Sequence, residues 1–235
     1  MTTAKIVVFD IDGTLTNSIE CHQQAFLKAL QSFQFPNLRT DWASYQHHSD
    51  SAIFAEAWQE SGYGSAPDVK EFEQRFNNEY NLAIHHYPFS AISGALEFIQ
   101  NIQKIGWRVA FATGSLRHAA LHKLKILGID GHQQILVTAS EFQTREDIVK
   151  QAVEIALSRY FVVSQPSQSQ PSKTQLSQVI SIGDGIWDFK TAQNLGYDFI
   201  GIGLEKINWS TFGVSAYADF TQILQIEQNR FEFLK

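Results

Sequence analysis

Short apolar runs recur along the chain, and segments with helical spacing separate most of them. Residues 5–9 (KIVVF) are mostly β-branched and too few for a helix, so they predict a buried parallel strand that ends at the polar turn DIDGT. Similar runs predict strands at 107–112, 134–139, 178–183, 198–203 and, as the weakest of the set, 215–220. Strands that alternate with helices in this way predict an α/β fold with a doubly wound parallel sheet.

The helices expected between these strands are followed by glycines. Apolar spacing predicts helices at 91–105, 116–127, 145–159 and 187–195. Gly106, Gly128 and Gly196 lie directly after three of these segments, where helices commonly end.

Residues 16–88 interrupt the alternation, because they contain three helical stretches and no convincing strand. We therefore expect an α/β core formed by 1–15 and 89–235, with a helical insertion at 16–88. Phe72, Phe76 and Tyr80 recur at helical spacing, which is typical of packing between helices rather than of a ligand site. The Ser-, Gln- and Pro-rich segment 164–178 predicts a mobile surface loop.

Composition and charge exclude several classes of protein. The 235 residues carry a formal charge of −6, which disfavours binding to the phosphate backbone of nucleic acids. Because no apolar run approaches the ~18 residues that a bilayer requires, we expect no membrane span. A secretory signal is not recognisable, and the single cysteine, Cys21, cannot form an internal disulfide. We therefore expect a cytoplasmic protein, as a monomer or homodimer.

Polar residues follow three of the predicted strands, at the edge where parallel sheets bind ligands. They are Asp10 and Asp12 after the first strand, Thr113, Gly114 and Ser115 after 107–112, and Asp184 and Asp188 after 178–183. Carboxylates that lie so close repel one another unless a cation or a proton lies between them. Mg²⁺ prefers oxygen ligands, so the clustered acids predict a magnesium site.

These motifs together resemble those of the haloacid dehalogenase-like hydrolase superfamily. The matching segments are DIDGT (10–14), ATGS (112–115), Arg145 within TRED, and GDGIWD (183–188), in the order that the superfamily uses. The resemblance covers essentially the whole chain and implies a Rossmann-like core with a type-one helical cap at 16–88. The superfamily usually has Lys-Pro where this chain has Arg145, so Lys150 is a competitor for its role.

The resemblance also implies roles for individual residues. Asp10 would be a metal ligand and the nucleophile that forms an aspartyl-phosphate, and Asp12 would be the general acid/base, with its backbone carbonyl on the metal. Asp184 would be a metal ligand, and Asp188 would be a second ligand or act through metal-bound water. Arg145 would neutralise the phosphoryl charge. The residues expected around the substrate are Thr113, Gly114, Ser115, Gly13, Thr14 and His22.

Simpler interpretations exist for single residues. An aspartate or threonine after a strand can cap the next helix, and Arg145 can pair with Glu146 or Asp147 on a solvated helix. His47, His48, His85 and His86 show no metal-binding pattern and are expected to be surface or packing residues.

Asp12 separates the possible reactions. Dehalogenases and phosphonatases of the superfamily lack an acid at this position, so we expect a phosphatase for a small phosphorylated metabolite, of the phosphoglycolate-phosphatase or sugar-phosphatase kind. The alternative is a phosphomutase similar to β-phosphoglucomutase; a histidine occurs at the position of His22 in that mutase and also in related sugar phosphatases. A third interpretation is a non-catalytic binding protein of the same fold.

Overall fold

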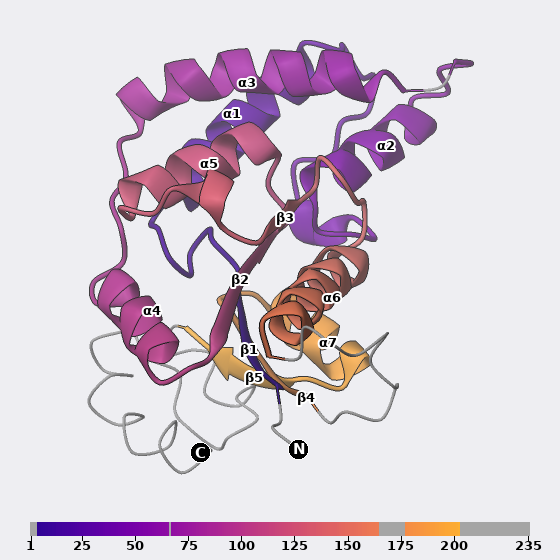
Figure 1. Ribbon diagram of the computed structural model, residues 1–235. Helices are drawn as coiled ribbons and strands as arrows, with labels where there is room; N and C mark the ends of the chain where they lie inside the picture. Colours follow the sequence, from indigo (N-terminus) through magenta and orange to yellow (C-terminus); the bar gives the residue numbers. More distant parts are fainter. Residues whose placement is uncertain (1–3, 66, 165–176, 203–235) are drawn as a thin grey trace.

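The computed structural model describes residues 4–65, 67–164 and 177–202. Within these residues it contains one five-stranded parallel sheet with the strand order β3-β2-β1-β4-β5 (Figure 1). The strands are β1 (Ala4–Phe9), β2 (Arg108–Thr113), β3 (Leu136–Thr138), β4 (Ser177–Gly183) and β5 (Asp198–Gly201). The predicted doubly wound sheet is confirmed, with β1 at its centre.

Side chains of β1 alternate between two apolar layers, as expected for a strand buried on both faces. Val7 and Phe9 pack with α4 (Ala95–Lys104) and α5 (Arg117–Ile126), whereas Ile6 and Val8 pack with α6 (Arg145–Ser164). Helix α7 (Ile186–Leu195) connects β4 to β5.

Most predicted elements occur within two residues of their expected bounds. The helix predicted at 91–105 begins later, because Ala91 pairs with Thr16 and Gly94 has a left-handed backbone with φ of 76°. Helix α6 extends five residues beyond the predicted end at 159, to Ser164. The strand predicted at 215–220 and residues 165–176 of the predicted loop lie outside the described residues.

The insertion contains α1 (Ile19–Gln31), a short 3-10 turn at Trp42–Ser44, α2 (Asp50–Glu60) and α3 (Val69–His86). The segment that enters the insertion and the segment that leaves it are hydrogen-bonded to each other. Asn17 N–H donates to Ser90 O and Ile92 N–H donates to Leu15 O, each over 2.9 Å. Helices α1 to α3 therefore form a unit that leaves and rejoins the core beside the end of β1. We call this unit the cap.

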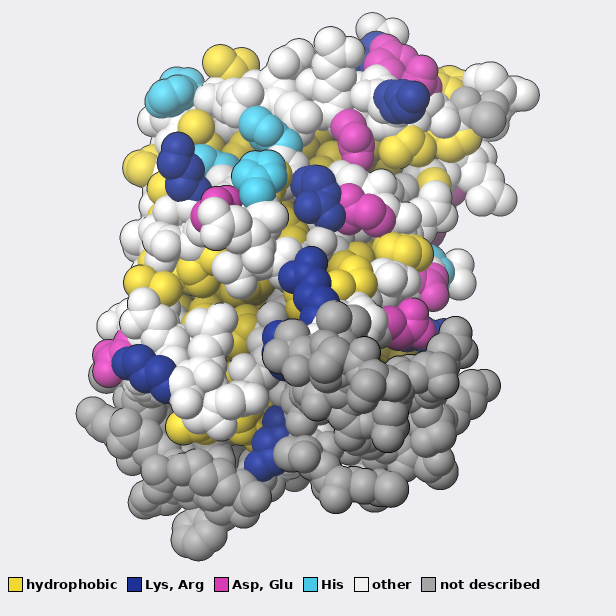
Figure 2. All heavy atoms as spheres, in the orientation of Figure 1, with side chains coloured by type: hydrophobic (Ala, Val, Ile, Leu, Met, Phe, Trp, Pro, Cys, Tyr) yellow, Lys and Arg dark blue, Asp and Glu magenta, His cyan; other side chains and the backbone are white. Residues whose placement is uncertain are grey.

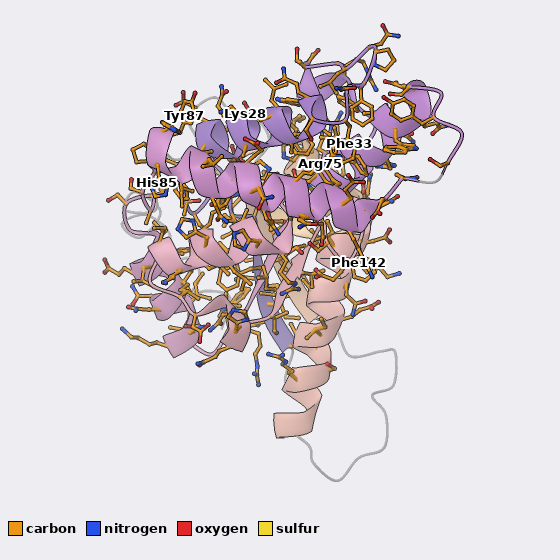
Figure 3. The ribbon with its side chains drawn as sticks, turned by 90° about the horizontal axis from the view of Figure 1, so that it is seen from above. Lys28, Phe33, Arg75, His85, Tyr87 and Phe142 are labelled. Carbon is orange, nitrogen blue, oxygen red and sulfur yellow. The ribbon has the colours of Figure 1, made fainter. Side chains whose placement is uncertain are left out.

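Aromatic side chains fill the interior of the cap. Phe72, Phe76 and Tyr80 of α3 are fully buried, and the ring of Phe72 stacks on Phe54 with the centroids 4.3 Å apart. At the edge of this cluster, the Arg75 guanidinium lies 4.1 Å from the centroid of the Phe33 ring (Figure 3). The predicted packing role of the aromatic residues of α3 is confirmed.

Histidine side chains gather at the surface over α3 and α5 (Figure 2). These helices carry the exposed His85, His86 and His118, so the predicted surface position of the first two is confirmed. None of the described helices is both long and apolar enough to cross a membrane.

Candidate active site

Three carboxylates meet at the carboxyl edge of the sheet. Asp10 directly follows β1, Asp184 directly follows β4, and Asp188 lies in the first turn of α7. One oxygen from each lies within 4.8 Å of the others, and Asp10 and Asp188 are buried. We call these three residues the acid cluster. The sequence prediction that strand order would bring these acids together is confirmed.

Arg145, the first residue of α6, lies against the acid cluster. Its Nη1 donates to Asp188 Oδ1 over 2.7 Å and to Asp10 Oδ1 over 3.1 Å. Burial and the neighbouring Asp188 raise the pKa of Asp10 to about 7, although Arg145 opposes this shift. The pKa of Arg145 stays above its ordinary range because Asp188 and Asp10 outweigh the effect of burial. Lys150, the competing residue, is exposed on α6.

The acid cluster has the composition of a site for a divalent cation. Among the described side chains, three carboxylates meet one guanidinium here, so acidic groups outnumber the basic one in a largely buried space. Hard cations such as Mg²⁺ prefer such oxygen donors. The acid cluster therefore fits a divalent metal, with Asp10, Asp184 and Asp188 as the side chains that could hold it.

Two glycines allow close approaches around the acid cluster. Gly13 has φ of 71°, and a Cβ there would lie 2.3 Å from Asp184 Oδ2. A Cβ on Gly114 would lie 2.6 Å from His48 O and 2.9 Å from Arg145 Nη2. Any side chain at these positions would displace a group of the site.

The side chain of Asp12 does not join the acid cluster, although the motif places it two residues after Asp10. Its Oδ1 accepts from Ser18 Oγ over 2.5 Å, and its Oδ2 accepts from Ser115 Oγ over 2.6 Å and from Lys123 Nζ over 2.7 Å. Burial alone would raise the pKa of Asp12, but the charge of Lys123 and the hydrogen bonds from Lys123 and Ser115 hold it well below its ordinary range. In this arrangement Asp12 is an ionised carboxylate.

Lys123 is fully buried and makes three polar contacts. Besides Asp12, its ammonium donates to Ser115 Oγ over 2.9 Å and to His22 Nδ1 over 3.1 Å. Because an ammonium only donates, Nδ1 of His22 is the acceptor, and Nε2 carries the proton that it donates to Asp50 Oδ1 over 2.9 Å. A chain of polar contacts thus runs from Asp12 into the cap.

Asp50 joins the cap to the core. Besides the contact with His22, its Oδ2 accepts from Leu116 N–H over 2.9 Å, and its own N–H donates to Gly114 O over 2.8 Å. The preceding residue, Ser49, caps α2 and donates to the carbonyl of Gln143. The start of α2 therefore contacts the loops after β2 and before α6.

The remaining predicted residues lie at the end of β2, in the loops that follow β1 and β2, and in α1. Thr113 is buried, and its Oγ1 accepts from Ser115 N–H over 3.2 Å. Thr14 is also buried and donates to Asp10 Oδ2 over 3.4 Å. Gly114, Ser115 and His22 line the cavity, whereas Thr113 lies behind its lining. The catalytic and binding roles expected of these residues stay predictions.

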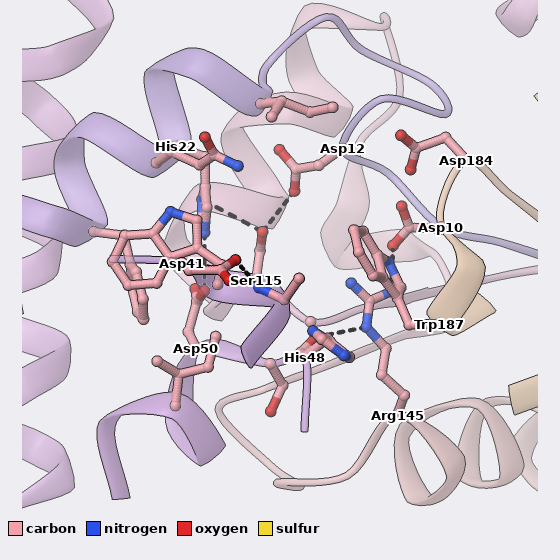
Figure 4. Close-up of a pocket in the computed structure, with 18 of the residues that line it drawn as sticks. Asp10, Asp12, His22, Asp41, His48, Asp50, Ser115, Arg145, Asp184 and Trp187 are labelled. Carbon is pink, nitrogen blue, oxygen red and sulfur yellow. Dashed lines mark hydrogen bonds and ion pairs between the residues drawn. The ribbon is translucent and has the colours of Figure 1, made fainter. Parts of the chain in front are cut away.

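A cavity of about 400 Å³ separates the core from the cap beside these groups. In the view of Figure 4, Asp10, Asp184 and Arg145 lie on one side of it, and His22, Asp41 and Asp50 lie on the other. His48 lines the cavity and stacks on Trp187, with the ring centroids 4.9 Å apart. This stacking agrees with the packing role expected of His48, whereas its place in the cavity lining was not expected.

Sequence reasoning missed Lys123, Asp50 and Trp187. For Lys123 a signal existed: it follows Leu116 and Ala120 at helical spacing, so it falls on the apolar face of α5. A lysine on such a face requires a buried partner. Asp50 and Trp187 carry no comparable signal, because an acid in a first helical turn and an aromatic residue beside a motif are both common.

The comparisons with known proteins agree with this geometry. A family model described as haloacid dehalogenase-like hydrolase matches residues 7–202, which include the acid cluster, Arg145 and the cap. The chain belongs to this family. The family predicted from the motifs is therefore confirmed, and this hydrolase carries its cap between β1 and α4.

Individual relatives of this hydrolase are distant. Pyrophosphatase PpaX from Bacillus pumilus is 23% identical over 215 residues, which cover 91% of this chain and 88% of the relative. A hydrolase from Pseudomonas syringae has the same fold, with a TM-score of 0.67, 19% identity, and coverage of 95% of this chain and 98% of that chain. CbbY from Rhodobacter sphaeroides, solved in complex with phosphate, has a TM-score of 0.59, 14% identity and 86% coverage of both chains.

Proposed function

We propose that this hydrolase is a magnesium-dependent phosphatase that releases phosphate from small phosphate monoesters. The observation that carries the proposal is the acid cluster with Arg145 at the carboxyl edge of the sheet, beside the cavity between the core and the cap. Support also comes from relatives, since PpaX is named a pyrophosphatase and CbbY was solved with phosphate.

Asp10, Asp184 and Asp188 would hold the metal. When bound, Mg²⁺ supplies positive charge that balances these carboxylates and stabilises charge on a transferring phosphoryl group. The backbone carbonyl of Asp12 is a further ligand by family resemblance. Arg145 adds a fixed positive charge beside Asp10, at the place where negative charge accumulates.

Asp10 would attack phosphorus and form an aspartyl-phosphate. Its position at the end of β1 is fixed, because its N–H donates to Ile182 O over 2.9 Å and its carboxylate contacts Thr14 and Arg145. Asp12 is held as a carboxylate, which suits the step in which a base removes a proton from water. To protonate the departing alkoxide, Asp12 must first take up a proton, and the contact with Lys123 opposes this.

Gly114 and Ser115 line the cavity beside Asp10, at the loop that leads into α5. The backbone N–H of Gly114 is suited to a phosphoryl oxygen, because peptide donors near a helix start favour anions. Thr113 would not contact the substrate; its hydroxyl would fix the position of Ser115 by accepting the Ser115 N–H.

The fate of the phosphoryl group separates this proposal from the mutase alternative. With Mg²⁺ and several phosphate monoesters, a phosphatase releases inorganic phosphate in each turnover. A long-lived phosphoenzyme that converts glucose 1-phosphate to glucose 6-phosphate with little free phosphate would establish the mutase. A verified, folded preparation that releases phosphate from no ester would favour the non-catalytic interpretation.

A further inference from the structure

The cap side of the cavity carries no lysine or arginine among the described residues. The cap residues that line it are Ile19, His22, Gln23, Phe26, Thr40, Asp41, Trp42, Ala43, His48, Ser49, Asp50 and Ile53. Arg39, next to Thr40 in the sequence, is turned away and pairs with Glu56 and Glu60. The leaving group of a bound ester would therefore meet no lysine or arginine on this side.

Histidines do not replace the missing cation. Nδ1 of His22 accepts a hydrogen bond from Lys123, so the ring cannot also donate from that nitrogen. Burial and the nearby Arg145 hold the pKa of His48 below its ordinary value, and its ring stacks on Trp187. Arg145, the one arginine of the described lining, already contacts two carboxylates of the acid cluster.

Acidic groups lie where a leaving group would extend. Asp41 and Asp50 both line the cavity, and Asp41 is exposed at the N-terminus of the turn Trp42–Ser44. Aromatic rings accompany them: Trp42 packs edge-on against Phe26 with the centroids 5.2 Å apart. An anionic leaving group would be desolvated here beside carboxylates, which is unfavourable, whereas a flat apolar group would contact the rings.

We infer that this site selects phosphate esters whose leaving alcohol is uncharged or cationic and carries a flat apolar part. Esters that carry a second anionic group, such as phosphorylated acids, bisphosphates and pyrophosphate, are poor substrates. The inference rests on the proposed phosphatase function. It also separates this chain from PpaX, whose name denotes a pyrophosphatase.

Three esters that differ at the para position test the inference: benzyl phosphate without a substituent, the anionic para-carboxybenzyl phosphate and the similarly sized, cationic para-(aminomethyl)benzyl phosphate. We expect kcat/KM for phosphate release with Mg²⁺ to be at least about tenfold lower for the carboxybenzyl ester than for the benzyl ester. The aminomethyl ester should equal or exceed the benzyl ester, and pyrophosphate should fall below it. A carboxybenzyl ester or pyrophosphate that matches or exceeds benzyl phosphate would overturn the inference and leave the phosphatase function intact.

Binding to the Asp10→Asn variant separates the two proposals. Calorimetric dissociation constants of the same three esters should show the same ranking, because binding requires no nucleophile. If the wild-type protein releases phosphate from none of the esters, the proposed function is contradicted. The ranking of dissociation constants still decides the inference, and a carboxybenzyl ester that binds as tightly as the benzyl ester overturns it.

Asp41 can be tested by a conservative change, because asparagine also caps a helical turn. Asp41→Asn should lower the ratio of kcat/KM for the aminomethyl ester to that for the benzyl ester by about two- to fivefold, as expected for loss of an exposed ion pair. Asp68→Asn is the matched control, because Asp68 is an exposed N-cap of α3 outside the cavity lining. An Asp41→Asn ratio equal to that of the control would overturn the part assigned to Asp41.

Discussion

Replacing the buried lysine at the centre of the polar chain tests how the core and cap are held together. Lys123→Met removes the ammonium but keeps a flexible side chain of similar volume, so the cavity left behind is small. Asp12 then loses its cationic partner at 2.7 Å, and His22 Nδ1 loses its donor at 3.1 Å.

The expected cost follows from the burial of the pair. Removing one partner of a fully buried ion pair costs about 3–5 kcal/mol. Lys123 is fully buried, but the side chain of Asp12 retains 18% exposure, so water partly compensates its charge. We therefore expect Lys123→Met to lower the free energy of unfolding by about 2–4 kcal/mol at neutral pH.

The cost should depend on pH in a defined direction. The pKa of Asp12 is depressed in the folded protein, so its stabilisation is present above its unfolded pKa of about 4 and is lost as the pH falls. In Lys123→Met, Asp12 can instead take up a proton in the folded state. The difference in stability between the variant and the wild type should therefore shrink as the pH falls through about 4.

Urea unfolding followed by circular dichroism measures these differences. The matched control is Lys125→Met, since Lys125 is exposed on the same helix and should change stability by less than about 0.5 kcal/mol. A double-mutant cycle with Asp12→Asn should give a coupling free energy of about 1–3 kcal/mol. A Lys123→Met variant as stable as the control, or a cycle without coupling, would refute this account of the pair.

Three further predictions concern the site itself. Arg145→Ala should lower kcat by about a hundredfold or more, and Lys150→Ala by less than about twofold, because Arg145 contacts the acid cluster whereas Lys150 is exposed; the reverse order in steady-state assays would transfer the role to Lys150. Gly114→Ala should lower stability by about 1–3 kcal/mol in urea unfolding, whereas Gly64→Ala, with open space around it, should not; equal effects would contradict the close approach. Chelation with EDTA should abolish phosphate release, Mg²⁺ should restore it and Ca²⁺ should inhibit it; full activity after exhaustive chelation would exclude the metal.

The positions of the clustered acids could be predicted because they follow from the geometry of parallel strands. Asp10 and Asp184 directly follow parallel strands, so both lie at the carboxyl edge of the sheet, and the pairing of β1 with β4 brings them together. Arg145 could be predicted as a candidate, but its contact with Asp10 depends on where α6 begins. Residue type alone could not separate it from Lys150.

The cap side of the site could not be predicted, because it depends on how the insertion folds back onto the core. His48 and Trp42 line the cavity whereas Arg39 does not, and this difference follows from the turn Trp42–Ser44 and from the pairing of Arg39 with Glu56. The sequence pattern of these polar and aromatic residues does not indicate which of them face the cavity. Lys123 could be predicted in part: helical spacing places it on the apolar face of α5, but the sequence does not show that Asp12 is its partner.

Identifying the residue that carries the phosphoryl group tests the central claim most directly. The protein is mixed with para-nitrophenyl phosphate and Mg²⁺, quenched in acid and reduced with borohydride, which converts an aspartyl-phosphate to homoserine. Trypsin then releases peptide 6–28, which contains both Asp10 and Asp12, so fragmentation by mass spectrometry separates the two positions. The account predicts homoserine at position 10 and none in the Asp10→Asn variant. Homoserine at position 12, or phosphate release at the wild-type rate by Asp10→Asn, would contradict it.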